Sequence, residues 1–305
     1  MYPAVIVVGP TGSGKSDLAL DIAQAFHGEI VNCDSVQLYR YMDIGTAKTP
    51  TQDRRGVPHH LIDILEPNEV FTAGEYQRLA RVTLAEIGSR GKLPVVVGGT
   101  GFYLRALLHG LFEGPQRDEE LRARLARRKR GSLHRLLTRF DPDAAAHIHA
   151  NDVKKLIRAL EVRLLTRQPI TALYDHNREP LQGFQIVQVG LDPDRQQLAE
   201  RINQRCVRMF EQGLVGEVER ILAMGFAADE KALQSIGYRE SIQFLQAKLT
   251  LPEAIERTQA ATRQYAKRQR TWFRRDPAIT WFADFGNQTE TCEAVKRHVQ
   301  AGLNL

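Results

Sequence analysis

A glycine-rich segment between an apolar run and a helix-forming run constrains the fold of this chain most. Residues 9–16 read Gly-Pro-Thr-Gly-Ser-Gly-Lys-Ser, the pattern of a phosphate-binding loop (P-loop). The apolar run 4–8 before it is typical of a buried strand, and residues 15–27 favour a helix. The residues predicted to bind phosphate are Gly9, Pro10, Thr11, Gly12, Ser13, Gly14, Lys15 and Ser16. Backbone N–H groups at such a helix N-terminus bind anions well.

Two side chains of this segment have the chemistry that a bound phosphate needs. The ammonium of Lys15 would contact phosphate oxygens, and the hydroxyl of Ser16 would be a ligand of Mg²⁺. The motif alone does not decide whether the phosphate belongs to a nucleotide such as ATP or to another compound.

The distribution of apolar runs predicts an α/β fold with a parallel sheet. Strands are expected at 4–8, 29–33, 60–65, 93–97 and 184–191, and the first four alternate with helices at 15–27 and 72–89. Residues 116–182 are charged and helical in pattern. We therefore expect a P-loop NTPase-like core, 1–115 plus 183–305, with a helical insertion domain. The final third favours helices at 195–213, 215–224, 236–247 and 251–274.

Composition narrows the class of protein. The chain has 305 residues, 43% of them hydrophobic, and no apolar run long enough for a membrane span. The N-terminus leads directly into the first strand, and three widely spaced cysteines suggest a reducing compartment. We therefore expect a cytoplasmic protein without a membrane partner, and a monomer by default.

Two basic stretches contain no acidic residue, within a net charge of +6. They are 122–130 and 257–275, and each is either a solvated helix face or a surface for nucleotide or nucleic acid. Within the second stretch, we expect the aromatic residues Tyr265, Trp272 and Phe273 to be mostly core and the arginines mostly exposed.

Polar residues follow two of the predicted strands, where α/β sheets bind ligands. Asp34 and Ser35 end the second strand; Asp34 could assist Mg²⁺ or accept a proton, or it could simply cap a turn. Gly98-Gly99-Thr100-Gly101 follows the strand 93–97, where an ATPase would often carry an aspartate, so a motor ATPase or GTPase is disfavoured. Arg201 and Arg205 share a helix face and could clamp a diphosphate or form a solvated stripe.

Several motifs occur in a specific order along nearly the whole chain, and together they closely resemble the bacterial tRNA dimethylallyltransferases. Besides 9–16, they are 34–48 (Asp-Ser-Val-Gln-Leu-Tyr-Arg-Tyr-Met-Asp-Ile-Gly-Thr-Ala-Lys), Pro58-His59-His60-Leu61-Ile62-Asp63, Gly98-Gly99-Thr100-Gly101-Phe102-Tyr103, Asn151-Asp152 through Glu161, Gly237-Tyr238-Arg239 and Lys267-Arg268-Gln269.

The resemblance implies an activity and roles for matched positions. The family transfers a dimethylallyl group from dimethylallyl diphosphate to N6 of adenosine 37 in the tRNA anticodon stem-loop, releases diphosphate and uses Mg²⁺. Residues 9–16 and Arg205 would bind the donor diphosphate, and Lys15, Asp34 and Thr100 would be catalytic, with Asp34 as general base. The positions implied to contact tRNA are Asp34, Ser35, Val36, Gln37, Thr100, Arg122, Lys154, Lys155, Leu156, Ile157, Arg158, Gly237, Tyr238 and Arg239. The family often has arginine where this chain has Lys155.

Two other functions compete with this interpretation. An adenylate isopentenyltransferase would use free AMP, ADP or ATP as acceptor, but it needs neither the basic stretches nor the helical insertion. A P-loop kinase of small molecules would bind ATP in the loop, and the absence of an acid after Val97 disfavours it.

Overall fold

The computed structural model describes residues 1–112, 114–174 and 179–304 of the chain. It divides into two compact units, Met1–Leu107 with Gln182–Leu305, and Leu108–Leu181. The helical insertion was predicted to begin at 116, whereas the second unit begins at Leu108. None of the helices in the described ranges is both long and apolar enough to cross a membrane.

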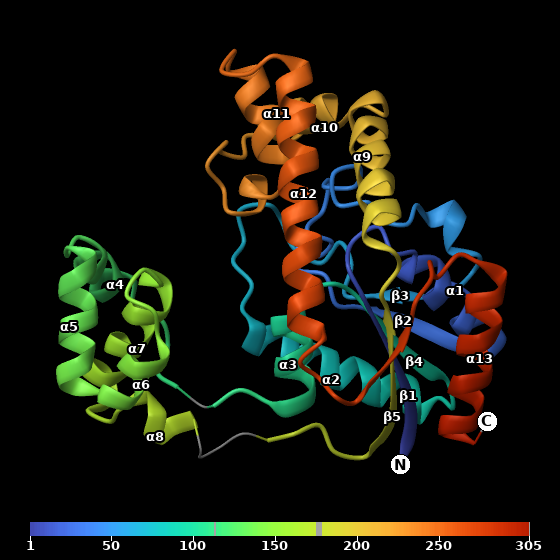
Figure 1. Ribbon diagram of the computed structural model, residues 1–305, viewed down its shortest axis with the longest axis horizontal. Helices are drawn as coiled ribbons and strands as arrows, with labels where there is room; N and C mark the ends of the chain where they lie inside the picture. Colours follow the sequence, from blue (N-terminus) through green and yellow to red (C-terminus); the bar gives the residue numbers. More distant parts are fainter. Residues whose placement is uncertain (113, 175–178, 305) are drawn as a thin grey trace. The chain divides into compact units, whose positions relative to one another are not determined.

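The larger unit is built on a six-stranded parallel sheet of order β3-β2-β4-β1-β5-β6 (Figure 1). The strands are β1 (Tyr2–Val8), β2 (Gly28–Asn32), β3 (His59–His60), β4 (Leu93–Val97), β5 (Phe184–Leu191) and β6 (Ile279–Phe282). The prediction of an α/β fold with a P-loop-type parallel sheet is confirmed.

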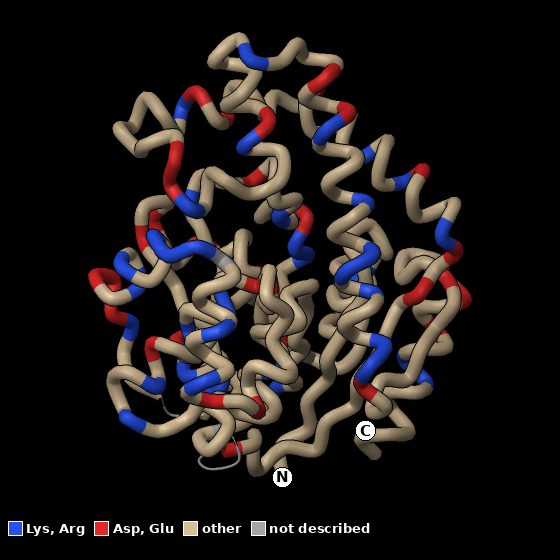
Figure 2. Tube along the Cα trace, turned by 60° about the vertical axis from the view of Figure 1, so that its left-hand side comes forward, with Lys and Arg blue, Asp and Glu red and all other residues tan. Residues whose placement is uncertain are grey.

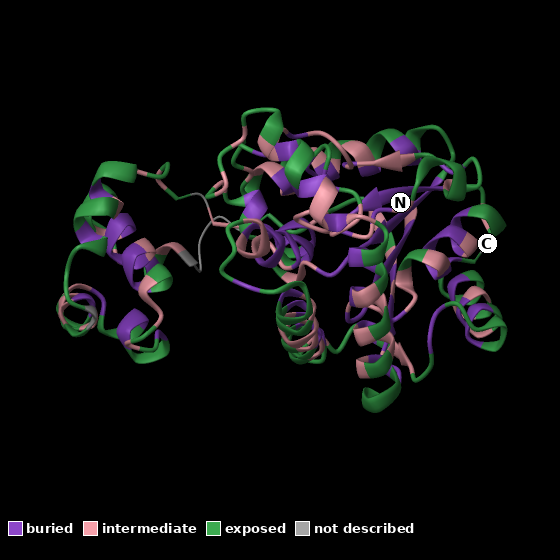
Figure 3. Ribbon diagram, turned by 90° about the horizontal axis from the view of Figure 1, so that it is seen from above, coloured by how far each residue is buried: buried purple, intermediate pink, exposed green. Residues whose placement is uncertain are grey.

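Helices cover both faces of this sheet, which is why its strands are apolar without alternation. Val5 and Val7 of β1 pack in one cluster with Leu18 of α1 (Lys15–Ala25) and Val295 of α13 (Thr289–Leu303). Helix α2 (Ala73–Ser89) contacts β1, β2 and β4 from the opposite side (Figure 1). Burial in Figure 3 follows this arrangement, with the strands buried and the outer helix faces exposed.

The remaining helices of the larger unit stand beyond the carboxyl ends of the strands or flank the sheet. They are η1 (Thr51–Arg54), α3 (Gly101–His109), α9 (Arg195–Glu211), α10 (Leu214–Ala223), η2 (Ala232–Gln234), α11 (Tyr238–Leu245) and α12 (Leu251–Phe273). The last two residues of α3 belong to the smaller unit. Helix α12 begins with a capping box, in which the Thr250 side chain accepts from the Glu253 N–H and the Glu253 carboxylate accepts from the Thr250 N–H.

The smaller unit is helical and has its own apolar core. Its helices are α4 (Glu119–Ala126), α5 (Arg130–Phe140), α6 (Pro142–His147), α7 (Val153–Thr166) and α8 (Ile170–Tyr174). Leu133 of α5 and Leu156 and Leu160 of α7 are completely buried in this core. Aspartates cap three of these helices: Asp118, Asp141 and Asp152 each accept from a backbone N–H in the first turn.

Two sequence predictions about the sheet were wrong. The strand expected at 60–65 is only His59–His60, because Leu61 and Asp63 have left-handed backbones, with φ of 57° and 55°, and end the pairing with β2. The final third was expected to be helical, but it contributes β6 and then α13. The strand β6 has only four residues and follows a long amphipathic helix, so the run is too short for its periodicity to identify it as a strand.

Candidate active site

The P-loop lines a cavity of about 590 Å³ at the carboxyl end of β1. The walls come from the loop and α1, from the segment 47–55 and from α9, all within the larger unit. Five lining residues are basic and two are acidic: Lys15, Arg55, Arg201, Arg205 and Arg208 against Asp17 and Asp53. A cavity with this excess of positive charge and a helix N-terminus in its wall is suited to a di- or triphosphate.

Lys15 and Arg205, both predicted to bind diphosphate, lie close enough to affect each other electrostatically. Burial and the charge of Arg205 lower the pKa of the Lys15 ammonium to about 8, although the carboxylate of Asp34 opposes the shift. Burial also lowers the pKa of Arg205, again against the effect of Asp34. The three groups therefore form one electrostatic cluster, and a bound polyanion would relieve the repulsion between its two cations.

This lowered pKa predicts a pH dependence of anion binding. The affinity for inorganic diphosphate should fall as pH rises through about 8, because Lys15 loses the proton that makes it a cation. Isothermal titration between pH 7 and 9.5 would measure this. In a Lys15→Arg variant the cation persists, so the decline should be much weaker; the same decline in both proteins would contradict the prediction.

The loop after β6 supports the P-loop from a direction that sequence analysis did not predict. The Gly286 N–H donates to the Ser13 carbonyl at 2.9 Å. Asn287 Oδ1 accepts from Arg201 at 2.8 Å, and the Arg201 guanidinium lies over the Phe285 ring at 4.8 Å. These contacts hold one cavity arginine in place and depend on a strand that was missed.

Asp34 and Thr100 lie together where β2 and β4 end. Asp34 Oδ1 accepts from the Val36 N–H at 3.0 Å, which leaves its other carboxylate oxygen without a hydrogen bond among the described residues. The Thr100 hydroxyl oxygen accepts from the Ser35 N–H at 3.0 Å, and the Thr100 N–H donates to the Cys33 carbonyl at 3.1 Å. A Cβ on Gly98 would lie 2.1 Å from that same carbonyl oxygen, so glycine is required there. The structure thus brings two of the three predicted catalytic positions together, and one carboxylate oxygen of Asp34 accepts no hydrogen bond from the described residues.

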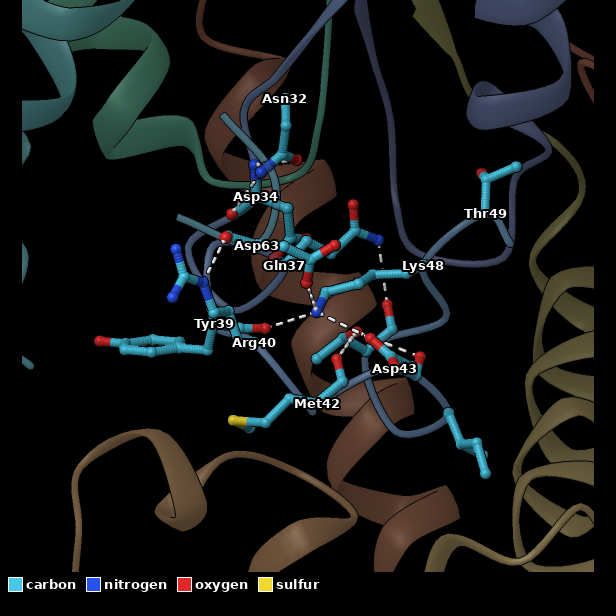
Figure 4. Close-up of polar contacts among 12 residues, drawn as sticks. Asn32, Asp34, Gln37, Tyr39, Arg40, Met42, Asp43, Lys48, Thr49 and Asp63 are labelled. Carbon is cyan, nitrogen blue, oxygen red and sulfur yellow. Dashed lines mark hydrogen bonds and ion pairs between the residues drawn. The ribbon is translucent and has the colours of Figure 1, made fainter. Parts of the chain in front are cut away.

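A buried lysine holds the segment that follows Asp34. The Lys48 ammonium, with its side chain 3% exposed, contacts Asp43 Oδ1 at 2.9 Å, Asp63 Oδ1 at 2.5 Å and the Tyr39 carbonyl (Figure 4). The Gln37 amide donates to the carbonyls of Thr46 and Ala47 at 3.0 and 3.3 Å. The segment 35–48 is therefore folded on itself around Lys48. The Lys48 side chain is buried, whereas those of Asp43 and Asp63 are 62% and 40% exposed, so the ion pairs lie at the edge of the fold.

Glu217 of α10 anchors the same segment from outside. Its carboxylate, on a residue 4% exposed, accepts from the backbone N–H groups of Asp43 and Ile44 at 3.1 and 2.9 Å. It also accepts from the Tyr238 hydroxyl at 2.5 Å, and a Cβ on Gly45 would lie 2.3 Å from the Tyr238 ring. The second anchor thus fixes residues 43–45 in a position that only glycine at 45 permits.

The Gly237-Tyr238-Arg239 motif, which is implied to contact RNA, also makes contacts within the protein. The Tyr238 side chain is completely buried, and the Gly237 N–H and the Arg239 guanidinium both contact the carboxylate of Glu240. The motif starts α11 and supports Glu217 through the Tyr238 hydroxyl. The Arg239 side chain is 43% exposed, so its contact with tRNA stays a prediction.

In the smaller unit, the implied RNA contacts also have structural partners. Glu161 of α7, whose side chain is 0% exposed, pairs with Arg122 at 2.7 Å and with Arg158 at 2.6 Å. Leu156 and Ile157 are buried in the core of the unit, where their side chains pack against apolar neighbours. The described structure leaves two of the implied contact residues exposed: Lys154 and Lys155, the latter paired with Asp152 at 2.9 Å.

Basic residues are distributed along both units and are interspersed with acidic ones (Figure 2). In the stretch 122–130, Arg124, Arg127, Arg128 and Lys129 are exposed. Along α12, Lys267 and Arg268 are exposed, whereas Arg270 is paired with Asp192 at 2.5 Å. These exposed cations suit a polyanion.

The expectation for the aromatic residues of α12 was right only in part. Phe273 is 2% exposed and belongs to the core, Tyr265 is half-buried, and Trp272 is 41% exposed. The Trp272 ring lies against Gly101, where a Cβ would come within 2.2 Å of it.

Ser16 is the residue predicted to bind a metal ion, and its surroundings fit a magnesium–phosphate complex better than a protein-made site. Ser16 lines the cavity beside Asp17. Within the described residues, no three His, Cys, Asp or Glu side chains form a cluster that could hold a metal ion. Mg²⁺ commonly takes most of its ligands from water and phosphate oxygens, with few from protein, and a hydroxyl at this position is compatible with that.

These features define a phosphate-binding α/β enzyme: a P-loop at the end of β1, a basic cavity, and an aspartate and a threonine at neighbouring strand ends. The strand β4 is not followed by the acidic residue that P-loop ATPases often carry there. Comparison with known proteins gives the family. The family model described as IPP transferase matches residues 37–276. The chain belongs to this family.

Individual relatives match over nearly the whole length of this chain. A tRNA dimethylallyltransferase of Solibacter usitatus is 58% identical over 300 residues, which cover 97% of this chain and 98% of the relative. The solved structure of the full-length tRNA isopentenylpyrophosphate transferase from Bacillus halodurans has 37% identity and a TM-score of 0.75, covering 100% of this chain and 97% of that one. A eukaryotic dimethylallyltransferase acting on tRNA superposes with a TM-score of 0.84 at 27% identity, covering 98% and 78%.

Proposed function

We propose that this chain transfers a dimethylallyl group from dimethylallyl diphosphate to N6 of adenosine 37 in the anticodon stem-loop of tRNA. The observation that carries the proposal is the electrostatic cluster of Lys15, Arg205 and Asp34, which joins a basic diphosphate cavity to a carboxylate with a free oxygen. Relatives named for this activity match along almost the entire chain, and they support the choice of donor and acceptor. The protein is proposed to act in the cytoplasm as a monomer.

In the proposed reaction, the bond between the allylic carbon and the diphosphate oxygen breaks, and a bond from that carbon to N6 forms. The departing electron pair remains on the diphosphate, where Lys15, Arg205 and the loop N–H groups stabilise the developing charge. The proton that N6 loses goes to Asp34, whose second carboxylate oxygen is available. Ser35, Val36 and Gln37 follow Asp34 in the chain, and the Ser35 N–H donates to the Thr100 hydroxyl. These residues would border the adenine.

Mg²⁺ is proposed as the cofactor. The Ser16 hydroxyl would contribute one ligand, and the ion would supply further neutralisation of the diphosphate charge. Lys15 and Arg205 hold the diphosphate in the cavity and contribute positive charge of their own, so part of the stabilisation of the leaving group comes from the chain itself.

We propose that exposed basic residues of each unit contact tRNA. In the smaller unit these are Lys154, Lys155 and the exposed residues of 122–130; in the larger unit they are Lys267 and Arg268. Arg122 and Arg158 are proposed to contribute by keeping the smaller unit folded through Glu161.

The experiment that tests this function is a transfer assay with labelled dimethylallyl diphosphate and Mg²⁺. We expect label in an unmodified tRNA transcript with adenosine at position 37, and no label when that position is guanosine or when AMP is the acceptor. Label in AMP but not in tRNA would contradict the proposal and indicate an adenylate isopentenyltransferase. Transfer of phosphate from ATP with no prenyl transfer would indicate a kinase.

A further inference from the structure

One buried amide connects the two loops on which the proposed reaction depends. Gln269 of α12 is 4% exposed, and its side chain reaches both loops at once. Its Oε1 accepts from the Thr11 N–H of the P-loop at 2.8 Å. Its Nε2 donates to the carbonyl of Gly99, in the loop after β4, at 2.9 Å.

The surroundings leave this amide little freedom. A Cβ on Gly99 would lie 2.0 Å from Gln269 Nε2, so the backbone approaches the amide as closely as glycine allows. One helical turn earlier, burial raises the pKa of the Tyr265 hydroxyl, and the nearby side chains of Thr100 and Gln269 oppose this rise. The bridge therefore has polar partners on both sides, and a buried amide with satisfied donors and acceptors is rigid.

We propose that Gln269 is a positioning residue that sets the spacing between the diphosphate loop and the loop bearing Thr100. This inference rests on the proposed function. Gln269 contacts neither substrate in this account: Thr11 belongs to the leaving-group side, and Thr100 adjoins Ser35 and Asp34 on the acceptor side. The amide therefore links the loop on the leaving-group side to the loop on the acceptor side.

Spacing matters because transfer needs the allylic carbon in line between a diphosphate oxygen and N6. A misplacement of about 1 Å can cost about 10²-fold in rate while leaving ground-state binding nearly unchanged. A residue that acts through spacing should therefore affect kcat more than the KM of either substrate. A residue that only stabilises the fold would lower the amount of active protein and the unfolding temperature.

Two substitutions remove the bridge in stages. In Gln269→Glu, a carboxylate oxygen still accepts from Thr11, but the donor to Gly99 is lost. In Gln269→Leu, both hydrogen bonds are lost. We expect kcat to fall about 10-fold in the first variant and about 10²-fold in the second, with both KM values within about 3-fold of the wild type. Gln300→Glu and Gln300→Leu, at an exposed position of α13, are matched controls.

A second measurement makes the test independent of turnover. Hydrogen exchange followed by mass spectrometry should show faster exchange in Gln269→Leu in two separate segments, 8–14 and 96–102, because the bridge holds both. The control variants should exchange like the wild type.

The outcomes separate this inference from the proposed function. A wild-type chain that does not prenylate tRNA would contradict the proposed function, and exchange would still decide whether the bridge holds both loops. An active wild type with unchanged kcat in both Gln269 variants would overturn the inference. So would a rise in KM at constant kcat, a rate loss equal to the loss of folded protein, or unchanged exchange in either segment.

Discussion

Replacing Asp34 by asparagine should reduce kcat for prenyl transfer by about 10²–10⁴-fold, the range expected when a general base is lost. Asparagine can keep the hydrogen bond from the Val36 N–H, so the local turn should persist. What it lacks is an oxygen able to take the proton from N6. Single-turnover rates with saturating donor and tRNA would measure the effect on the chemical step directly.

The control for this variant is Asp229→Asn, at an exposed position away from the strand ends, which should be as active as the wild type. Binding of inorganic diphosphate should be retained in Asp34→Asn, because removing a carboxylate does not weaken a basic cavity. Turnover within about threefold of the wild type would refute the role of Asp34 as base.

Replacing Glu161 by alanine should destabilise the smaller unit by about 3–5 kcal/mol, because it leaves two arginines beside a buried site without their partner. Burial raises the pKa of Glu161, but hydrogen bonds from Arg122 and Arg158 outweigh it and lower that pKa to about 2. The carboxylate thus stabilises the fold fully above its ordinary pKa, near 4.5, and this stabilisation is lost as pH falls towards 2. Hydrogen exchange of residues 108–181 in the full chain would measure the loss.

Glu120→Ala provides the comparison, because Glu120 is exposed on α4 of the same unit and should change stability by less than about 0.5 kcal/mol. The result also distinguishes two roles of the arginines. If Glu161→Ala leaves exchange in the unit unchanged, Arg122 and Arg158 are not structural, and direct contact of both with tRNA becomes the better interpretation.

The sequence predicted the sheet well wherever strands are long and apolar. Residues 4–8 and 93–97 lie at its centre, and every side chain there is buried, so the apolar signal is continuous. The six-stranded sheet is incomplete in the prediction because β6 has four residues and follows Asp276-Pro277, which looks like the end of a helix. At His59–His60 the strand is short because left-handed residues follow, and such backbone conformations are not visible in a pattern of apolar residues.

For the site, motifs identified the loops but not what holds them. Gly9–Ser16, Asp34 and Thr100 were found because glycines, a lysine and a carboxylate occur directly after strands. A lysine is usually exposed, and an isolated tyrosine can lie in many environments. The sequence around Lys48 and Tyr238 therefore does not show that the lysine is buried and paired with aspartates, or that the tyrosine donates to a glutamate. Gly45, which the Tyr238 ring requires, lies in the motif 34–48, but no role was predicted for it, because only Asp34 to Gln37 of that motif were implied to contact tRNA.

The three outside tethers of the functional loops all come from the last third of the chain: Glu217 holds residues 43–45, Gln269 holds Thr11 and Gly99, and Gly286 holds Ser13. During synthesis, the strands that precede the P-loop, Asp34 and Thr100 are complete long before Glu217, Gln269 and Gly286 have been added to the chain. During synthesis the phosphate-binding loop should therefore emerge without its final geometry, and a nascent chain stopped after β5 should bind little diphosphate. Assembly of the site belongs to the closing stage of folding, after the distant ends of the sequence have met.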